Sequence, residues 1–300
     1  MSGLILGGTG QMGRALSELL PGAVVWSRMD ADFLTPEAWL DNLEKLRPDW
    51  VINACAYTAV DLAESPTEFE RALTVNATTP VKIAQRCAKL SIPFVHYSTD
   101  YVYSDASNPD RRPWVESDLT APLNAYGRTK LAGDEDIAKI RGKWLIFRTS
   151  WVFAPNGKNF VNTMLRLGAT QPEVRVVADQ VGAPSYAPDL AVATVEALEK
   201  ASNAKSFPSG IYHLCNSGQT TWAEFAREIF RQSGHNCRVV DLATADYPTP
   251  ARRPLNSQLS LNKTQEVFGI HLPLWQDALA RCLSAHQDTK KTEPPTQVAQ

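Results

Sequence analysis

Long hydrophobic runs are missing from this sequence of 300 residues, and so are a basic leader and a cleavage site near its N-terminus. No apolar stretch approaches the roughly 20 residues that a membrane-spanning helix requires. Because neither an export signal nor a membrane anchor can be identified, we expect a cytoplasmic protein without a membrane partner.

Cysteines are few, and neither sign of charge dominates. The five cysteines are widely spread and include no C-x-x-C pair, so neither a disulfide framework nor a zinc site is expected. Lys and Arg number 30 against 32 Asp and Glu, and the formal net charge of −2 argues against a nucleic-acid partner. The apolar content of 44% is enough for a substantial core in one large domain or two modest ones.

A glycine-rich segment lies close to the N-terminus. The apolar run 2–6 leads into glycines at positions 7, 10 and 13, and helical spacing continues from 14 to 20. Strand, glycine turn and helix in this order let a pyrophosphate approach the N-terminus of the helix, where free N–H groups favour an anion. We therefore predict a dinucleotide-binding motif, with a turn that has no ligand as the weaker alternative.

Strands and helices alternate through the first half of the chain, which predicts an α/β fold with a Rossmann-type doubly wound parallel sheet. We expect strands at 2–6, 23–26, 49–54, 92–97 and 144–148, and helices at 14–20, 35–46 and 64–90. Residues 1–150 would form the dinucleotide-binding domain, to which later segments could return.

The alternation weakens after position 150. Residues 151–285 should mainly form a smaller C-terminal α/β substrate-binding lobe over the carboxyl edge of the sheet. Expected helices are 159–167, 186–200, 221–233 and 273–284, and expected strands are 174–177 and 211–214. The segment 286–300 is rich in Lys, Thr, Pro and Gln with few apolar residues, so we predict a disordered tail.

Tyr126 and Lys130 are separated by one helical turn if the segment around them is helical. A phenol is a poor acid near its ordinary pKa of about 10, and a neighbouring ammonium would lower that pKa toward neutrality. Such a pair can exchange a proton with a substrate oxygen, whereas an idle pair on a solvated helix face is the alternative. Thr99, after the strand at 92–97, could place a hydroxyl beside them or serve simply as a strand former.

The end of the second strand bears on the choice of cofactor. NAD-preferring enzymes often carry an acid there, but this sequence has Ser27 and Arg28. A hydroxyl and a guanidinium suit a ribose 2′-phosphate, so we expect NADPH, with NADH as a second possibility. A solvated Arg28 is the alternative, and Asp30 or Asp32 could reach the ribose instead.

Several segments together resemble the dTDP-4-dehydrorhamnose reductase family of extended short-chain dehydrogenases/reductases. In the first half they are 7–13, 53–61, 97–103, 122–133 and 147–153, and in the second half 179–184, 210–213, 221–225 and 247–254. The resemblance implies reduction by NADPH of the C4 keto group of dTDP-4-dehydro-6-deoxy-L-mannose. The product would be dTDP-L-rhamnose, in the last step of dTDP-rhamnose biosynthesis.

The resemblance also implies roles for individual residues. Tyr126 matches the proton donor, Lys130 the residue that lowers its pKa and holds the nicotinamide ribose, and Thr99 the hydroxyl that binds the keto oxygen. Arg252, with Arg253 as its substitute, is the candidate cation for the diphosphate. Further substrate contacts fall on Thr58, Val60, Asp100, Tyr101 and Trp151. Expected cofactor contacts are Gly7, Gly10, Gln11, Met12, Gly13, Ser27, Arg28, Asp32, Phe33, Ala56, Tyr57, Thr58, Tyr97, Tyr126 and Lys130.

Some questions stay open in the sequence. Certain family members are magnesium-bridged dimers built on surface carboxylates, but Ala15 offers none, so no metal site is expected and the dependence on Mg²⁺ is undecided. The protein is expected to be a monomer or a homodimer. Two other functions fit the same motifs: a reductase or epimerase of another nucleotide-linked sugar, and a non-catalytic NADP-binding regulatory subunit.

Overall fold

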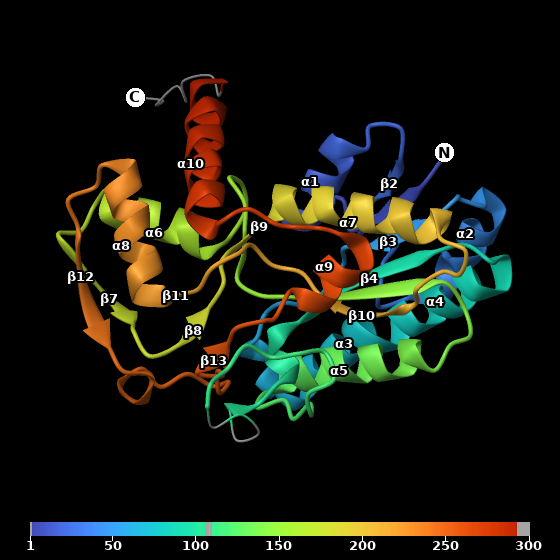
Figure 1. The fold of residues 1–300 in the computed structure, drawn as a ribbon, viewed down its shortest axis with the longest axis horizontal. Coiled ribbons are helices and arrows are strands. Elements are labelled where there is room, and N and C mark those ends of the chain that lie inside the picture. The colour runs from blue at the N-terminus through green and yellow to red at the C-terminus, as the bar shows by residue number, and fades with distance from the viewer. Residues whose placement is uncertain (1, 106–107, 109, 293–300) are drawn as a thin grey trace.

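Six parallel strands form the central sheet of this protein, whose computed structural model describes residues 2–105, 108 and 110–292 and, for 287–292, only the backbone. The strand order is β10-β5-β4-β3-β1-β2, so the chain runs from β1 outward to β2 and then, from β3 on the other side of β1, outward through β4 and β5 to β10. Figure 1 shows helices on both faces of this sheet and a second group of elements beside it. The strands are β1 (Leu4–Leu6), β2 (Val24–Trp26), β3 (Val51–Asn53), β4 (Phe94–Thr99), β5 (Trp144–Thr149) and β10 (Gly210–His213).

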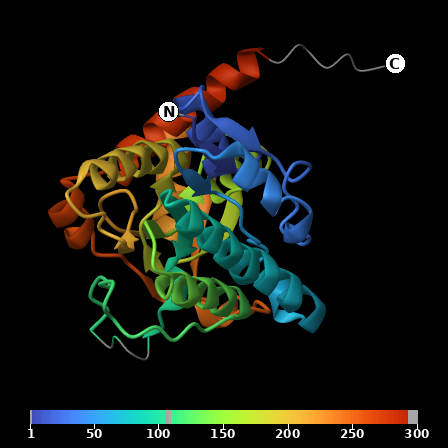
Figure 2. The same ribbon diagram turned by 90° about the vertical axis from the view of Figure 1, so that its right-hand side faces the viewer.

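The two faces of the sheet are covered because successive strand residues point to opposite sides. Ile5 and Val95 pack against α1 (Gln11–Leu19) and α7 (Ala187–Asn203), whereas Leu4 and Phe94 pack against the other layer. That other layer contains α2 (Leu40–Leu46), α3 (Pro66–Leu73), α4 (Thr79–Leu90) and α5 (Ala125–Ala138). Figure 2 shows α4 and α5 lying together on the face opposite α7. Burial on both faces explains why these strands appear as continuous apolar runs in the sequence.

Two of the predicted helices are interrupted. The segment 35–46 divides into a 3₁₀ turn, Pro36–Ala38, and α2, because Trp39 leaves the helical conformation and its indole donates to the Asp32 carbonyl at 2.8 Å. The segment 64–90 stays helical from Pro66, but a π-helical stretch, Thr74–Thr78, joins α3 to α4.

The smaller lobe is built from short strands and three helices around its own core. Its strands are β6 (Val152–Phe153), β7 (Glu173–Val177), β8 (Val181–Gly182), β9 (Ser185–Tyr186), β11 (Thr220–Thr221), β12 (Arg238–Leu242) and β13 (Asn256–Ser257). Its helices are α6 (Phe160–Gly168), α8 (Trp222–Ser233) and α10 (Trp275–Thr292). Phe153, Phe225 and Trp275 are buried where these elements meet.

Part of the second half returns to the first domain. Residues 211–214 were expected in the smaller lobe, but β10 pairs in parallel with β5 and α7 packs on α1. Helix α9 (Asn262–Phe268), which the sequence analysis did not predict, lies beside α7 and β10. The prediction of a disordered tail from 286 onward is wrong for residues 286–292, because α10 continues to Thr292 through residues that favour helix. The rest of that tail, 293–300, lies outside the described residues.

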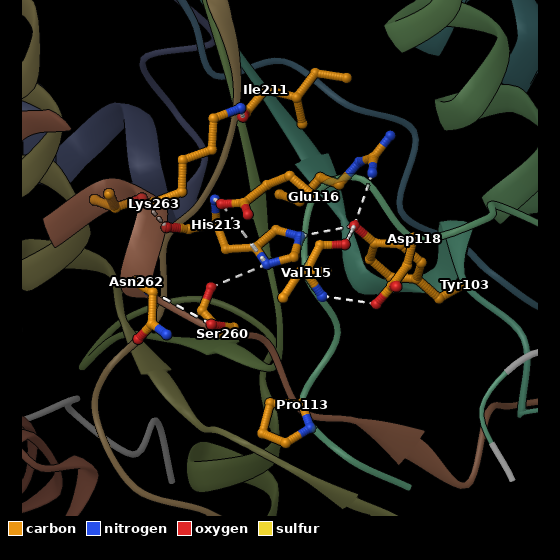
Figure 3. Close-up of polar contacts among 12 residues, drawn as sticks. Tyr103, Pro113, Val115, Glu116, Asp118, Ile211, His213, Ser260, Asn262 and Lys263 are labelled. Carbon is orange, nitrogen blue, oxygen red and sulfur yellow. Dashed lines mark hydrogen bonds and ion pairs between the residues drawn. The ribbon is translucent and has the colours of Figure 1, made fainter. Parts of the chain in front are cut away.

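Side chains close the exposed edge of β10, as Figure 3 shows. Glu116 Oε1 accepts from the His213 amide at 2.9 Å, and Lys263 Nζ donates to the Ile211 carbonyl at 2.7 Å. Thr264 Oγ1 donates to the His213 carbonyl at 2.6 Å. These bonds occupy backbone groups that an additional strand would otherwise use, so they protect the sheet from edge-to-edge pairing.

His213 itself is fully buried and should make stability depend on pH. Its ring nitrogens lie 2.7 Å from the Tyr103 hydroxyl and 3.1 Å from the Ser260 carbonyl oxygen. Burial, then the charge of Arg148, lowers its pKa to about 3; Lys263 adds to this, while the Ser260 carbonyl and Asp118 oppose it. Because the unfolded chain binds the proton first, stability is complete above about pH 6.5 and falls as the pH is lowered.

We therefore expect His213→Gln to lose less stability than the wild type when the pH falls from 7.5 to 5. The difference should be about 2 kcal/mol, measured as the free energy of unfolding in urea at both pH values. Exposed His271 provides a matched control, since His271→Gln should lose as much as the wild type. An equal loss in His213→Gln would show that this ring does not stay neutral in the folded state.

Candidate active site

The glycine turn between β1 and α1 forms a close backbone cradle. A Cβ at Gly13 would lie 2.1 Å from the Gly7 carbonyl oxygen, so a larger residue cannot occupy this position without moving the turn. Gly10 is the N-cap of α1 and brings no side chain to its first N–H groups. These groups remain available to an anion at the N-terminus of the helix, as a pyrophosphate would need.

A cleft of about 330 Å³ extends from this turn across the ends of β1, β2 and β3. It brings together seven of the predicted cofactor residues: Gly7, Gly10, Arg28, Asp32, Phe33, Ala56 and Tyr57. Its other lining residues, which the sequence did not identify, include Thr9, Cys55, Arg71 and Val75. An anion cradle continuous with an apolar slot suits the diphosphate and adenine of a dinucleotide, so the residues present fit that cofactor.

The polar residues after β2 make different contacts, and only some of them border the cleft. Asp30 Oδ2 accepts hydrogen bonds at 2.8 Å from both the amide and the hydroxyl of Ser27, so this carboxylate is occupied by the turn. Arg28 lies in the cleft wall with 71% of its side chain exposed, 3.6 Å from an Asp32 oxygen. A guanidinium and a carboxylate therefore both border the cleft, and the role of Arg28 toward a 2′-phosphate stays a prediction.

Two predicted cofactor residues direct their side chains into the core. Met12 packs within the layer that contains α1 and α7, and the Tyr97 hydroxyl lies 2.7 Å from Thr194 Oγ1. Only the backbone atoms of Met12 and Tyr97 are therefore available to contact a cofactor. Gln11 links the glycine turn to the smaller lobe, because its Oε1 accepts from Asn159 Nδ2 at 2.9 Å.

Helix α5 brings Tyr126 to the end of β4. Asn124 caps the helix by accepting from the Gly127 amide at 2.8 Å, and a Cβ at Gly127 would lie 2.3 Å from the Tyr101 carbonyl oxygen. This close approach brings the phenol close enough to Thr99 for that side chain to influence the pKa of Tyr126. The Thr99 hydroxyl itself donates to Asp100 Oδ1 at 3.0 Å and accepts from the Tyr101 amide at 3.2 Å. The predicted hydroxyl and phenol therefore meet at the carboxyl edge of the sheet.

Lys130 takes a different position from the one expected. Its buried ammonium donates to the Tyr97 carbonyl and lies 3.2 Å from His96 Nε2, one helical turn from Tyr126. Burial lowers the pKa of Lys130 to about 8, against the opposing charge of Asp134. Burial, then the charge of Asp100, raises the pKa of Tyr126, and Thr99 offsets only part of the rise. Desolvation is therefore the largest influence on the phenol in the unliganded structure, and the lowering of its pKa by Lys130 stays a prediction.

Buried polar residues that the sequence analysis missed hold this arrangement in place. His96 lies 3.0 Å from Asn53 Nδ2, and burial followed by the charge of Lys130 lowers its pKa well below the usual value, which keeps the ring neutral. Asp134 accepts from Ser98 Oγ at 2.9 Å and from Arg148 Nε at 3.0 Å. The sequence signal that could have identified them is a polar residue within an otherwise apolar strand, because a buried polar group needs a hydrogen-bond partner.

The substrate residues predicted after β4 gather around Tyr126. Tyr101 packs edge-on against its ring, with centroids 6.0 Å apart. Asp100 is buried, and burial raises its pKa to about 7, a rise that the nearby Ser257 and Thr99 side chains partly offset. Its Oδ2 has no hydrogen-bond partner among the residues that the structure describes.

The two arginines considered for the diphosphate differ in position. Arg252 exposes its side chain, and its backbone carbonyl accepts from Asn124 at 2.8 Å. Arg253 is half-buried and donates to both carboxylate oxygens of Asp61, at 2.8 and 2.7 Å. Burial raises the pKa of Tyr101, and the charge of Arg253 opposes that rise, so the substitute candidate Arg253 acts on a residue of the predicted site.

The remaining substrate candidates lie in two loops. Thr58 and Val60 follow β3, where Thr58 is exposed and its carbonyl accepts from the Val60 amide at 2.9 Å. Trp151 follows β5 with a backbone φ of +48° and stacks on Trp222 with ring centroids 3.6 Å apart. This stack joins the end of the main sheet to α8 of the smaller lobe.

Two kinds of feature are absent from the part of the chain that the structure describes. Its His, Cys, Asp and Glu side chains nowhere form a group of three that could hold a metal ion. Its helices include none that combines the length and apolar character needed to cross a membrane.

Known proteins share both the sequence and the fold. Residues 1–288 match the family model described as the RmlD substrate binding domain. The dTDP-4-dehydrorhamnose reductase of Escherichia coli strain K12 is 44% identical over 297 residues, covering 95% of this chain and 97% of that protein.

Solved structures agree with the sequence comparison. A dTDP-4-dehydrorhamnose reductase from Clostridium acetobutylicum superposes with a TM-score of 0.88 at 32% identity, over 96% of this chain and 100% of that one. The enzyme of the same name from Bacillus anthracis, solved in complex with NADP, gives 0.87 at 31% identity over 95% and 100%.

Proposed function

Because this chain belongs to the RmlD substrate binding domain family, we propose that it is an NADPH-dependent dTDP-4-dehydrorhamnose reductase. It reduces the C4 keto group of dTDP-4-dehydro-6-deoxy-L-mannose to give dTDP-L-rhamnose, in the last step of dTDP-rhamnose biosynthesis. We expect it to act in the cytoplasm as a monomer or homodimer, without a nucleic-acid partner. The observation that carries the proposal is the contact of Thr99 with Tyr126 beside the dinucleotide-shaped cleft.

A cofactor held by the residues of the cleft would supply a hydride to the keto carbon, and side chains of the protein act on the keto oxygen. The Thr99 hydroxyl donates to Asp100 Oδ1 in the unliganded structure, and on substrate binding it would turn to donate to the keto oxygen and stabilise the negative charge that develops there. Tyr126 transfers its proton to the same oxygen, which completes the hydroxyl group of the product. The phenol is protonated in the neutral range, but burial raises its pKa and weakens it as an acid, and we expect the nearby charge of Lys130 to oppose this rise in the reacting complex.

Cations and buried polar groups prepare the site for an anionic sugar nucleotide. Lys130 holds α5 against β4 through its bond to the Tyr97 carbonyl, and the family resemblance makes it the residue that we expect to bind the nicotinamide ribose. Arg253 is the candidate for the diphosphate, with Asp61 as its counter-ion in the unliganded arrangement. The relative from Bacillus anthracis binds NADP, and Arg28 in the cleft wall supports the same preference here.

Two alternatives are answered by the same measurement. An enzyme acting on another nucleotide-linked sugar would keep the shared motifs, and a regulatory subunit would bind NADPH without oxidising it. The intact set of Thr99, Tyr126 and Lys130 favours an enzyme. A panel of nucleotide sugars, including the keto sugar nucleotide prepared enzymatically in place, should be tested with NADPH and NADH separately, following absorbance. Oxidation of NADPH only with another nucleotide sugar, or binding of NADPH without its oxidation by any sugar in the panel, would overturn the proposal.

Replacing Tyr126 tests the acid directly. Tyr126→Phe removes the donated proton, so turnover should fall by about 10²-fold to 10⁴-fold while NADPH affinity stays nearly unchanged. Turnover is followed by NADPH absorbance and affinity by fluorescence titration. Wild-type turnover in this variant would assign the proton to another group.

Replacing Arg28 tests the choice of cofactor. Arg28→Ala should raise the Michaelis constant for NADPH by about tenfold and leave that for NADH nearly constant, because only NADPH carries the 2′-phosphate. Arg14, which donates to the Thr9 carbonyl at 3.1 Å, provides a neighbouring cation as control. An equal rise for both cofactors would remove the 2′-phosphate role of Arg28.

A further inference from the structure

Thr149 ends β5 directly beside Thr99. The two residues are partners in the parallel register of β4 and β5, so their side chains leave the sheet on the same face. Both are buried, with 8% and 5% of their surfaces exposed. A second hydroxyl therefore lies next to the one that contacts Tyr126.

The hydroxyl of Thr149 is unusual because Oγ1 has no hydrogen-bond partner in the described part of the structure. The hydroxyl groups of other buried threonines do form hydrogen bonds. Thr264 donates to the His213 carbonyl at 2.6 Å, and Thr129 donates to the Tyr126 carbonyl at 2.8 Å. An unpaired buried hydroxyl destabilises a folded protein, so such a group needs an explanation at the site where it occurs.

A second unpaired atom lies at the same edge. Asp100 Oδ2 has no partner within the described residues, and Asp100 directly follows Thr99. Two buried polar atoms without partners thus border the hydroxyl that contacts Tyr126, one on β5 and one after β4. This pattern suits a ligand that carries several polar groups around its reacting carbon.

The strand order indicates which ligand reaches Thr149. The cofactor cleft lies at the ends of β1, β2 and β3, and β4 separates these strands from β5. On the other side, Ser150 Oγ donates to the Ala183 carbonyl at 2.9 Å, which connects this strand end to the smaller lobe. Thr149 therefore faces the substrate side of Thr99.

We propose that Thr149 binds the hydroxyl group on the ring carbon next to the keto carbon of the substrate sugar. The inference rests on the proposed function, in which Thr99 binds the keto oxygen. Adjacent strands are about 4.8 Å apart, a spacing that lets neighbouring side chains contact neighbouring substituents of one sugar ring. Thr149 is thus a specificity-determining residue, and it makes no contact with the transferred proton.

Thr149→Val, which removes the hydroxyl at nearly constant volume, tests this assignment. With the keto sugar nucleotide we expect kcat/KM to fall about tenfold and the affinity for NADPH to remain unchanged. With the analogue that lacks the neighbouring hydroxyl, wild type and Thr149→Val should have equal kcat/KM. Thr149→Ser should retain activity on the normal substrate, because it keeps the hydroxyl.

Thermal unfolding without ligand separates binding from a structural role. Thr149→Val removes an unpaired hydroxyl, so its Tm should equal or exceed that of the wild type. The matched control Thr264→Val loses a paired hydroxyl, so its Tm should fall while its KM for the sugar nucleotide stays constant.

Three outcomes would overturn the assignment in an active wild-type enzyme. They are unchanged kcat/KM in Thr149→Val, an equal loss with the deoxy analogue, and a loss of NADPH affinity in place of sugar specificity. A wild-type protein that reduces no keto sugar nucleotide would instead contradict the proposed function itself.

Discussion

A buried ammonium joins helix α5 to strand β4, and the geometry of the site depends on it. Lys130 is 1% exposed and donates to the Tyr97 carbonyl, with the ring of His96 beside it. Burying a charge is costly unless polar groups surround it, so this contact determines how α5 lies against the sheet. Tyr126 is carried on the same helix, and its contact with Thr99 follows from that placement. The lowered pKa of His96 belongs to the same arrangement, because a charged ring would repel the ammonium.

The smaller lobe is tied to this centre by contacts of different kinds. Asp61 and Arg253 form a bidentate ion pair between the loop after β3 and the loop before β13. Trp151 and Trp222 stack across the junction between β5 and α8. Both contacts border the edge that carries Thr99, so a ligand there would touch both parts of the molecule. Sites at the carboxyl edge of a parallel sheet commonly use loops in this way, with the sheet as a rigid support.

Strong local patterns made much of the first domain predictable. The glycine turn at 7–13 and the buried strands appear in the sequence as spacing and apolar runs, and the family resemblance named the activity that the relatives carry. The sequence predicted that later segments could return to the first domain, but not that β10 would be the strand that does so, since a short strand looks the same in either sheet. The length of α10 was misjudged for a related reason, because composition alone does not reveal a helix that continues from a packed segment.

What the sequence determined by itself was the order of the elements, the glycine cradle and the choice of proposed reacting groups, because each of these depends on local spacing and residue type. Only the tertiary structure decided the environment of those groups. It turned Lys130 toward Tyr97, raised the pKa of Tyr126 by burial, and left the Thr149 hydroxyl beside Thr99 without a partner among the described residues. Desolvation and hydrogen-bond pairing depend on residues distant in the chain that pack around a group, so local pattern cannot supply them.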